Sequence, residues 1–207
     1  MSKLNIVSFE RSLFDPRLIY LYTPDGLLHA REHYRHQNWF ATSDGRVLRL
    51  TKRGRLTEQT LTKCTAKVPE GKAHIYKDGK RWGSTYLLIP GLTFLCKRTI
   101  CAHRFIYECW KGPIEKGMTI DHLNGDKYDN RIVNLDAVTI QENIRRLHLL
   151  RAMRDSTDND GKPLWNMAYY HERPWLLKEL FSKDLGHLSH VPTDDQINYE
   201  LTHHCEY

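Results

Sequence analysis

The first half of the chain carries short runs of β-branched, aliphatic and aromatic residues. These runs lie at 18–22, 27–30, 39–42, 47–50 and 73–76, and Asp-Gly pairs follow the first, third and fifth of them. Apolar runs joined by Asp-Gly are typical of β-hairpins. We therefore predict a β-rich region over residues 1–99, in which the polar and basic stretch 51–72 forms a loop or an arm.

The spacing of apolar residues changes to a helical period after residue 100. Five apolar residues recur at i, i+3, i+4, i+7 and i+8, which places them on one face of an amphipathic helix. They are Ala102, Phe105, Ile106, Cys109 and Trp110. Gly112 and Pro113 follow directly, and this pair is a signal that ends the predicted helix.

Strand and helix patterns alternate over the next forty residues. The sequence predicts strands at 118–122 and 135–138, with a polar loop from 123 to 131 between them. Thr139 is followed three residues later by Glu142, which is the pattern of a capping box and predicts a helix from Ile140 to about Met153. Residues 100–154 therefore form one region, a helix followed by strand, loop, strand and helix.

The remaining residues, 155–207, are expected to form an acidic, helical C-terminal extension. Polar residues over 155–161 are typical of a linker. Pro174 near its start and Gly186 after its end predict a helix over 174–185, and 193–196 has a second capping-box pattern. The predicted fold class is α+β. We find no chemistry in the extension and expect it to be dispensable for chemistry elsewhere.

Charge is distributed unevenly along the chain. The net charge is +6, but residues 44–104 hold fourteen Lys and Arg against four acids, a net +10. The extension holds ten acids against four bases, a net −6. The basic segment therefore favours a polyanionic partner such as nucleic acid. The acidic extension would repel nucleic acid, and it suits instead a docking surface for a protein partner.

Composition argues against several other classes of protein. The content of 40% hydrophobic and 27% charged residues is that of a globular protein, and no apolar run approaches the roughly 18 residues of a membrane span. Five cysteines without a CxxC pair argue against a disulfide framework or a zinc ribbon. Glu10 and Arg11 follow the first short apolar stretch, so we expect no secretory signal and a cytoplasmic location.

Four polar residues stand at the ends of the elements predicted between 118 and 153. Asp121 and His122 end the first strand, Asn134 begins the second, and Asn143 lies in the first turns of the helix. A helix packed across a hairpin would bring these side chains together. A neutral imidazole suits a general base near pH 7. A carboxylate and an amide oxygen suit Mg²⁺ or Mn²⁺, which offset charge during phosphodiester hydrolysis.

The order and spacing of these residues resemble the HNH endonucleases, and most closely the phage-type and homing nucleases of that superfamily. The resemblance covers about 100–146 closely, the N-terminal third loosely and 155–207 not at all. The residues that carry it are His103-Arg104, Asp121-His122-Leu123-Asn124-Gly125-Asp126, Asp129-Asn130-Arg131, Asn134-Leu135 and Glu142-Asn143.

This resemblance implies a metal-dependent DNA endonuclease with a ββα-metal core over 100–154 that nicks or cuts duplex DNA. It implies that His122 is the general base and that Asp121 and Asn143 bind one divalent cation, Mg²⁺ or Mn²⁺. It also implies that Asn134 belongs to the catalytic group by fixing the His122-bearing hairpin through hydrogen bonds. Asn143 stands where many members have a histidine ligand, which argues against zinc.

Basic residues on both sides of the site are expected to contact the phosphates of DNA. Simple solvation is the alternative for Arg145 and Arg146, which lie on the helix predicted from Ile140 to about Met153. The residues expected to contact phosphates are Arg46, Arg49, Lys52, Arg53, Arg55, Arg104, Arg145 and Arg146.

Simpler interpretations exist for each motif taken alone. Asp121-His122 alone is usually a turn with an exposed imidazole, and Asn130 and Asn134 can be turn residues. The loop 123–131 resembles a calcium loop but lacks the glutamate at the twelfth position. The joint occurrence of these residues in the right order is what supports an active site.

Three other functions stay open from the sequence. The chain can be a nuclease that acts on RNA or structured DNA, or a catalytically idle HNH fold used as a DNA- or partner-binding module. It can also be the nuclease subunit of a phage packaging or replication complex, docked through its acidic extension. The intact set of Asp121, His122 and Asn143 weighs against the idle module.

Overall fold

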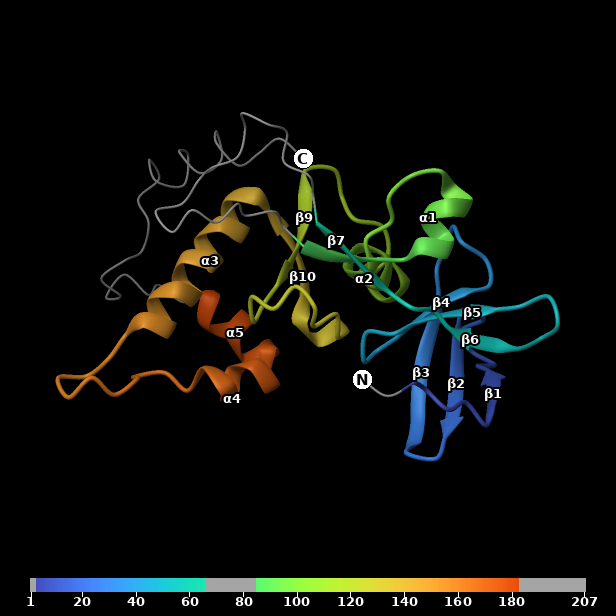
Figure 1. Ribbon diagram of the computed structural model, residues 1–207, viewed down its shortest axis with the longest axis horizontal. Coiled ribbons are helices and arrows are strands. Elements are labelled where there is room, and N and C mark those ends of the chain that lie inside the picture. Colours follow the sequence, from blue (N-terminus) through green and yellow to red (C-terminus); the bar gives the residue numbers. More distant parts are fainter. Residues whose placement is uncertain (1–2, 66–84, 183–207) are drawn as a thin grey trace. The chain divides into compact units, whose positions relative to one another are not determined.

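The computed structural model describes residues 3–65 and 85–182 of the chain (Figure 1). The chain divides into two compact units, Met1–Gly112 and Pro113–Tyr207. The fold is mixed α/β, with a curled antiparallel sheet in the first unit and several helices. The strand expected at 73–76, Gly186 and the capping box expected at 193–196 lie outside the described residues. Within the described ranges, no helix has the length and apolar character needed to cross a membrane.

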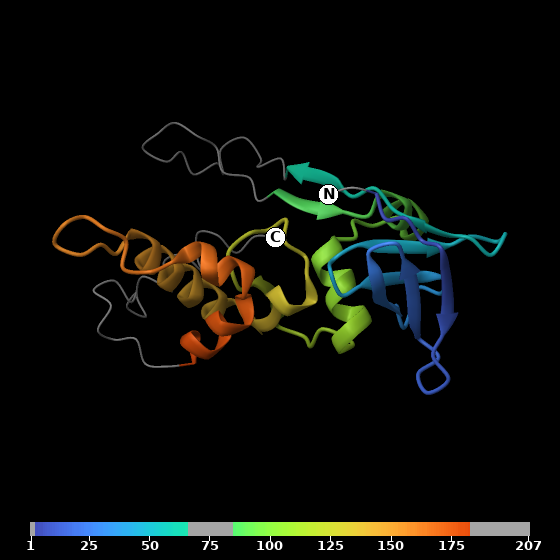
Figure 2. The ribbon, with the colours of Figure 1, turned by 90° about the horizontal axis from the view of Figure 1, so that it is seen from below.

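Six strands of the first unit form one antiparallel sheet in chain order, and the sheet curls (Figure 2). The second to fifth strands of this sheet, counted in chain order, confirm the strands predicted at 18–22, 27–30, 39–42 and 47–50. The strands are β1 (Ser8–Arg11), β2 (Leu18–Thr23), β3 (Gly26–Glu32), β4 (Trp39–Thr42), β5 (Val47–Leu50) and β6 (Leu56–Glu58).

Alternation of side chains along the strands builds the core of this sheet. Successive residues of a strand face opposite sides, so every second residue can be buried. Ile19 and Leu21 of β2 are both fully buried, and the residues on either side of each are more exposed. The buried cluster consists of Ile19, Leu21, Ala30, Phe40 and Leu48.

The expectation of a loop over 51–72 is wrong for two stretches, because β6 and β7 (Thr62–Thr65) lie within it. Gly54 has a φ of 74° and its N–H donates to the carbonyl of Thr51 at 2.9 Å, which makes a tight turn after β5. The chain then returns as β6 beside β5. Strand pairing uses the backbone, so the polar side chains of Thr57 and Glu58 do not prevent it.

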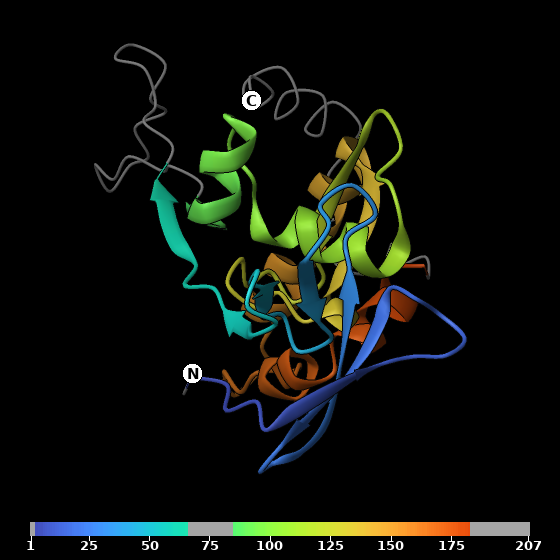
Figure 3. The same ribbon diagram turned by 90° about the vertical axis from the view of Figure 1, so that its right-hand side faces the viewer.

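The first unit also contains a second strand pair and two helices. β7 pairs with β8 (Thr85–Leu88), and β7 is the upper blue-green strand at the left of Figure 3. The helix α1 (Pro90–Cys96) precedes α2 (Ala102–Lys111), which confirms the helix predicted from residue 102. The apolar stripe of α2 is buried except for Trp110, whose indole N–H donates to the carbonyl of Ala41 in β4 at 3.1 Å.

The second unit has the predicted order of strand, loop, strand and helix. The Thr139 hydroxyl accepts a hydrogen bond from the N–H of Glu142 at 3.2 Å, so the predicted helix start is confirmed. Two helices follow in the region 155–182, which confirms helical structure there. The elements are β9 (Met118–His122), a 3₁₀ turn η1 (Ile132–Asn134), β10 (Leu135–Thr139), α3 (Ile140–Asp155), α4 (Met167–Glu172) and α5 (Pro174–Phe181).

The core of the second unit requires the C-terminal extension. Leu177 and Phe181 of α5 are buried, at 0% and 2% exposed, against the apolar face of α3. Truncation at residue 155 would uncover that face, so the extension contributes to the folded core, whereas its dispensability for chemistry stays a prediction. The buried cluster consists of Leu123, Leu149, Leu150, Met153, Leu177 and Phe181.

Candidate functional site

The β9–β10 hairpin places its two central polar residues on different faces. Asp121 lies opposite Asp136, and His122 lies opposite Leu135. Because side chains alternate along a strand, Asp121 and Asp136 share one face and His122 belongs to the other. Asp121 is 8% exposed and His122 is 5% exposed. Like charges directly opposite each other destabilise a hairpin, so the pair of carboxylates requires a nearby cation.

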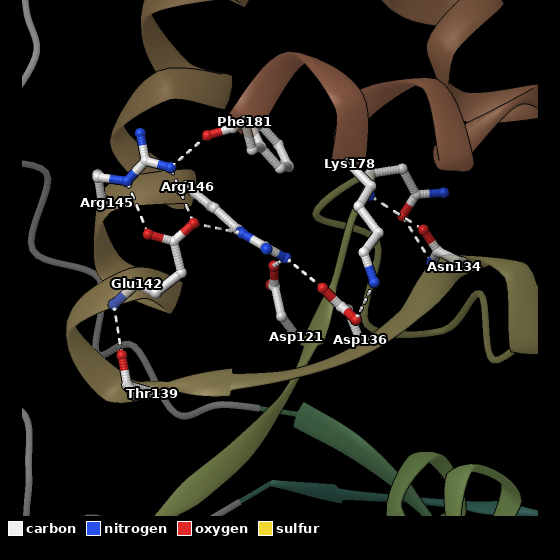
Figure 4. A network of polar contacts seen from close by, with 10 residues as sticks. Asp121, Asn134, Asp136, Thr139, Glu142, Arg145, Arg146, Lys178 and Phe181 are labelled. Atoms are coloured by element: carbon white, nitrogen blue, oxygen red, sulfur yellow. Dashed lines mark hydrogen bonds and ion pairs between the residues drawn. The ribbon is translucent and has the colours of Figure 1, made fainter. Parts of the chain in front are cut away.

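Arg146 of α3 supplies that cation (Figure 4). Its Nη1 lies 2.9 Å from Oδ2 of Asp136 and 3.4 Å from Oδ2 of Asp121, and its Nε donates to Glu142 at 2.8 Å. The guanidinium carbon lies 5.3 Å from the centre of the Phe181 ring. Arg146 therefore links the hairpin, the first turn of α3 and α5 through one buried side chain.

Two further basic residues extend this network to α5. Nζ of Lys178 lies 2.7 Å from Oδ1 of Asp136. Arg145 donates to both carboxylate oxygens of Glu142, at 2.7 and 2.8 Å, and to the carbonyl oxygen of Phe181 at 2.5 Å. Arg145, like Arg146, is thus engaged within the protein, and contact of either side chain with DNA stays a prediction.

Neighbouring positive charge offsets the carboxylates of this network to different extents. Burial raises the pKa of Asp121 to about 6, although the charge of Arg146 opposes this rise. Burial also acts on Glu142, but hydrogen bonds from Arg145 and Arg146 hold its pKa below the ordinary value. Asp121 is therefore a carboxylate that an additional cation would stabilise.

Asp121 and Asn143 fit a hard divalent cation by the chemistry of their oxygens. Asn143 is half-buried and precedes Arg146 by three residues on α3, so these side chains are neighbours on the helix surface. Mg²⁺ and Mn²⁺ accept such a small set of carboxylate and amide oxygens because they retain several waters. The described residues contain no group of three His, Cys, Asp or Glu that could hold a metal ion.

His122 is held in one tautomer by an amide on the loop after β9. Its Nε2 lies 3.1 Å from Oδ1 of Asn130. Because an amide oxygen only accepts, Nε2 carries the proton and Nδ1 is the acceptor nitrogen of the neutral ring. Burial lowers the pKa of His122 below its ordinary value, although the bond to Asn130 opposes this. The ring is thus in the form that can take a proton from water near pH 7.

Asn134 organises the loop that carries Asn130. Its Nδ2 donates to the carbonyl of Asp129 at 2.8 Å and to the side chain of Asn124 at 2.9 Å, and its Oδ1 accepts from the N–H of Asn124 at 3.0 Å. We expected Asn134 to fix the His122-bearing hairpin, and the structure adds Asn130 as the side chain bonded to the ring. The sequence contained Asn130 within the motif, but nothing in its spacing distinguished it from a turn residue.

The extension also holds this loop. The guanidinium of Arg131 forms bonds of 2.8 and 2.6 Å to Asp129 and donates to the carbonyl oxygens of His171 at 2.9 Å and Glu172 at 3.3 Å. His171 and Glu172 are the last two residues of α4. Sequence reasoning missed this contact because it joins residues about forty positions apart.

The basic residues predicted to bind DNA in the first unit differ in their surroundings. Arg46 is paired with Asp44 at 2.9 Å and with Glu58 at 3.5 Å, and Arg49 lies over the Trp39 ring at 5.3 Å. Their contact with DNA stays a prediction, as it does for the four exposed residues. These are Lys52, Arg53, Arg55 and Arg104.

Residues 101–145 match the family model described as HNH endonuclease. The matched segment begins at α2 and ends in the first turns of α3, so it contains Asp121, His122 and Asn143 but neither Arg146 nor α5. Comparison with curated proteins returned no match, and comparison with solved structures returned none either.

Proposed function

From the membership of residues 101–145 in the HNH endonuclease superfamily, we propose that this protein is a metal-dependent endonuclease that hydrolyses DNA phosphodiester bonds. The family supports nuclease activity in general. The observation that carries the finer proposal is the imidazole of His122, neutral and fixed by Asn130 with Nδ1 as its acceptor nitrogen. A neutral imidazole held in one orientation with an acceptor nitrogen suits a general base.

In the proposed reaction, His122 Nδ1 accepts a proton from a water molecule. The oxygen of that water forms a new bond to phosphorus, and the bond between phosphorus and the leaving oxygen breaks. The leaving oxygen takes a proton from solvent, and His122 later returns its own. Asp121 and Asn143 would hold a divalent cation, which when bound would supply positive charge to offset that of the phosphate and the leaving oxygen. In this account β9, β10 and α3 form a ββα-metal core.

The position of His122 as the last residue of β9 is part of this proposal. Asp121 and His122 belong to opposite faces of the strand, so a phosphate along the middle of β9 would meet only one of them. A phosphate at the strand end can contact both. One such site acts on one phosphate at a time, so we expect a single protein molecule to nick one strand of duplex DNA.

One observation favours a second candidate, a catalytically idle HNH module. Asp121 is paired with Arg146, and a permanent pair would withhold this carboxylate from a metal. The contact of 3.4 Å is longer than the 2.9 Å contact between Arg146 and Asp136, and the pKa of Asp121 is raised to about 6. Both features indicate that Arg146 offsets the charge of Asp121 only in part. This carboxylate therefore remains a candidate metal ligand, and we favour the enzyme.

Cleavage of supercoiled plasmid DNA, beside a structured RNA of similar length, tests the proposal. We expect open circles to accumulate with Mg²⁺ or Mn²⁺ and not in EDTA, and the RNA to stay intact. Cleavage of the RNA alone would show a different substrate. Mn²⁺ binding without cleavage of either nucleic acid would identify the idle module.

A further inference from the structure

A cavity of about 270 Å³ lies in the first unit, among the chain after β3, the residues between α1 and α2, and α2 itself. Pockets for drug-sized ligands usually have about 300–1,000 Å³, so this cavity suits a small group. Its polar lining includes His33, Tyr34, Arg35, Arg98, Arg104 and Glu108.

Positive charge predominates in this lining. Arg35, Arg98 and Arg104 are exposed, and no ion pair of theirs is found in the described part of the chain. Glu108 is the single carboxylate among the lining residues. Three guanidinium groups around a small cavity, with one carboxylate to offset them, favour an anionic ligand.

The carboxylate of Glu108 already has partners in the cavity wall. The N–H of Arg35 donates to Nδ1 of His33 at 3.0 Å, so Nε2 of His33 carries the proton and donates to Glu108 at 3.2 Å. Tyr34 adds a second donor at 3.4 Å. Burial raises the pKa of Glu108, but the hydrogen bond and charge of His33, the charge of Arg104 and the bond from Tyr34 outweigh it and hold the pKa below its ordinary value. Glu108 therefore offsets part of the charge of Arg104, and the guanidinium of Arg35 lies over the Tyr34 ring at 5.0 Å, but one carboxylate leaves the lining with an excess of positive charge for a ligand.

The first turn of α2 forms one side of the cavity. The ring of His33 stacks on Phe105 of α2, with centres 4.8 Å apart and planes 13° apart. Cys101 is the N-cap residue of α2, its side chain does not cap the N–H groups of the first turn, and both Cys101 and Arg104 line the cavity. The N–H groups of a first helical turn and the positive end of the helix dipole favour an anion.

We propose that this cavity binds one phosphate group of a nucleic-acid strand, as a second contact beyond the residues of the proposed active site. The phosphate chemistry rests on the arginines and the cavity, whereas the nucleic acid as its source rests on the proposed function. Guanidinium groups match the oxygens of phosphate with paired hydrogen bonds, which an isolated surface lysine does not provide.

A titration of the full chain with inorganic phosphate in EDTA, followed by ¹H–¹⁵N NMR, tests the cavity itself. We expect saturable shifts of the Cys101 and Arg104 amides and of the Arg98 guanidinium, and none with chloride at the same ionic strength. Thr99 lines the cavity, so Thr99→Trp should fill it without a change in charge and abolish these shifts. Leu13→Trp, at a residue 96% exposed, is the control for added bulk. Unsaturable shifts, or shifts unchanged by Thr99→Trp, would overturn the proposal.

The salt dependence of oligonucleotide binding, again in EDTA, tests whether nucleic acid supplies the phosphate. If Arg98 and Arg104 share one phosphate, the double variant Arg98→Gln/Arg104→Gln should lower the slope of log Kd against log salt by about one. Each single variant should show most of that loss. Inorganic phosphate should compete with the oligonucleotide on the wild type and not on the double variant.

The double variant Arg53→Gln/Arg55→Gln is the matched control, because both residues are exposed in the turn after β5. It should leave competition by phosphate intact. An unchanged slope in Arg98→Gln/Arg104→Gln would overturn the nucleic-acid assignment, and a fall of about two would show separate phosphates on an open surface. These measurements need no cleavage. A protein that binds phosphate here but cuts nothing would contradict the proposed function alone.

Discussion

Arg146 donates to Asp121 across 3.4 Å, from α3 to the face of β9 that carries the proposed metal ligand. The same guanidinium lies 2.9 Å from Asp136, which is directly opposite Asp121 in the hairpin. Arg146 thus offsets the repulsion between two facing carboxylates. A divalent cation at Asp121 would perform part of the same electrostatic task, so the two cations are linked through one carboxylate.

Arg146→Gln should destabilise the metal-free protein by about 3 kcal/mol, because it leaves Asp121, Asp136 and Glu142 without their shared cation. Urea unfolding measures the loss, and millimolar Mg²⁺ or Mn²⁺ should restore part of it. Arg151→Gln on the exposed face of α3 is the control and should change the stability by no more than about 0.5 kcal/mol. Equal effects of the two substitutions would show that the network adds nothing.

Asp121→Asn should stabilise the metal-free protein at pH 7.5. The pKa of Asp121 is raised from 3.8 to about 6, so the folded state holds more protons than the unfolded state between these values. Stability therefore falls as the pH rises through this window, by at most about 3 kcal/mol, and the amide escapes the loss. Unfolding at pH 4 and pH 7.5 tests this, and the advantage of the variant should nearly vanish at pH 4. A variant less stable than wild type at pH 7.5 would contradict the assignment.

Asn130→Asp should move the acidic limb of the pH–rate profile to higher pH. His122 acts as a base when neutral, and burial lowers its pKa below the ordinary value in the wild type, which favours the neutral form. A carboxylate at residue 130 would favour the charged imidazole and raise that pKa. Measurements of kcat/KM against pH check the shift. A lower rate with an unshifted profile would mean that Asn130 has only a structural role.

Leu177→Ala should lower the free energy of unfolding by about 2–5 kcal/mol, because the side chain is fully buried between α5 and α3. Leu164→Ala removes the same atoms from a residue 61% exposed and should cost far less. Chemical unfolding followed by circular dichroism gives both values. Similar small losses would indicate that α5 is a detachable appendage after all.

Local patterns predicted the elements of both units well, because each signal lies within a few residues of its effect. The Asp-Gly turns gave β2 to β5, and the pair of Thr139 and Glu142 gave the start of α3. The β6 strand was missed because its polar side chains hide a pairing made by the backbone. The sequence also predicted Asp121, His122 and Asn134 in or beside one hairpin, and the structure has them there, but Asp121 and His122 belong to opposite faces of β9.

The partners of the site residues were not predictable in the same way. Arg146 was assigned to DNA because a basic helical residue beside a nuclease motif suggests phosphate contact, yet it faces two aspartates on the hairpin. Lys178 lies 42 residues from Asp136 along the chain, so no periodicity connects them. Contacts of this range depend on how α5 packs on α3, which sequence patterns do not specify.

The central claim is that His122 is the general base of a nuclease, and single-turnover cleavage of duplex DNA with saturating Mg²⁺ tests it most directly. His122→Ala should slow cleavage by at least about 10²-fold while its DNA affinity in EDTA stays within a factor of about two. His29→Ala, at an exposed residue of β3, should cleave like the wild type. A folded His122→Ala protein that cleaves at the wild-type rate would contradict the account.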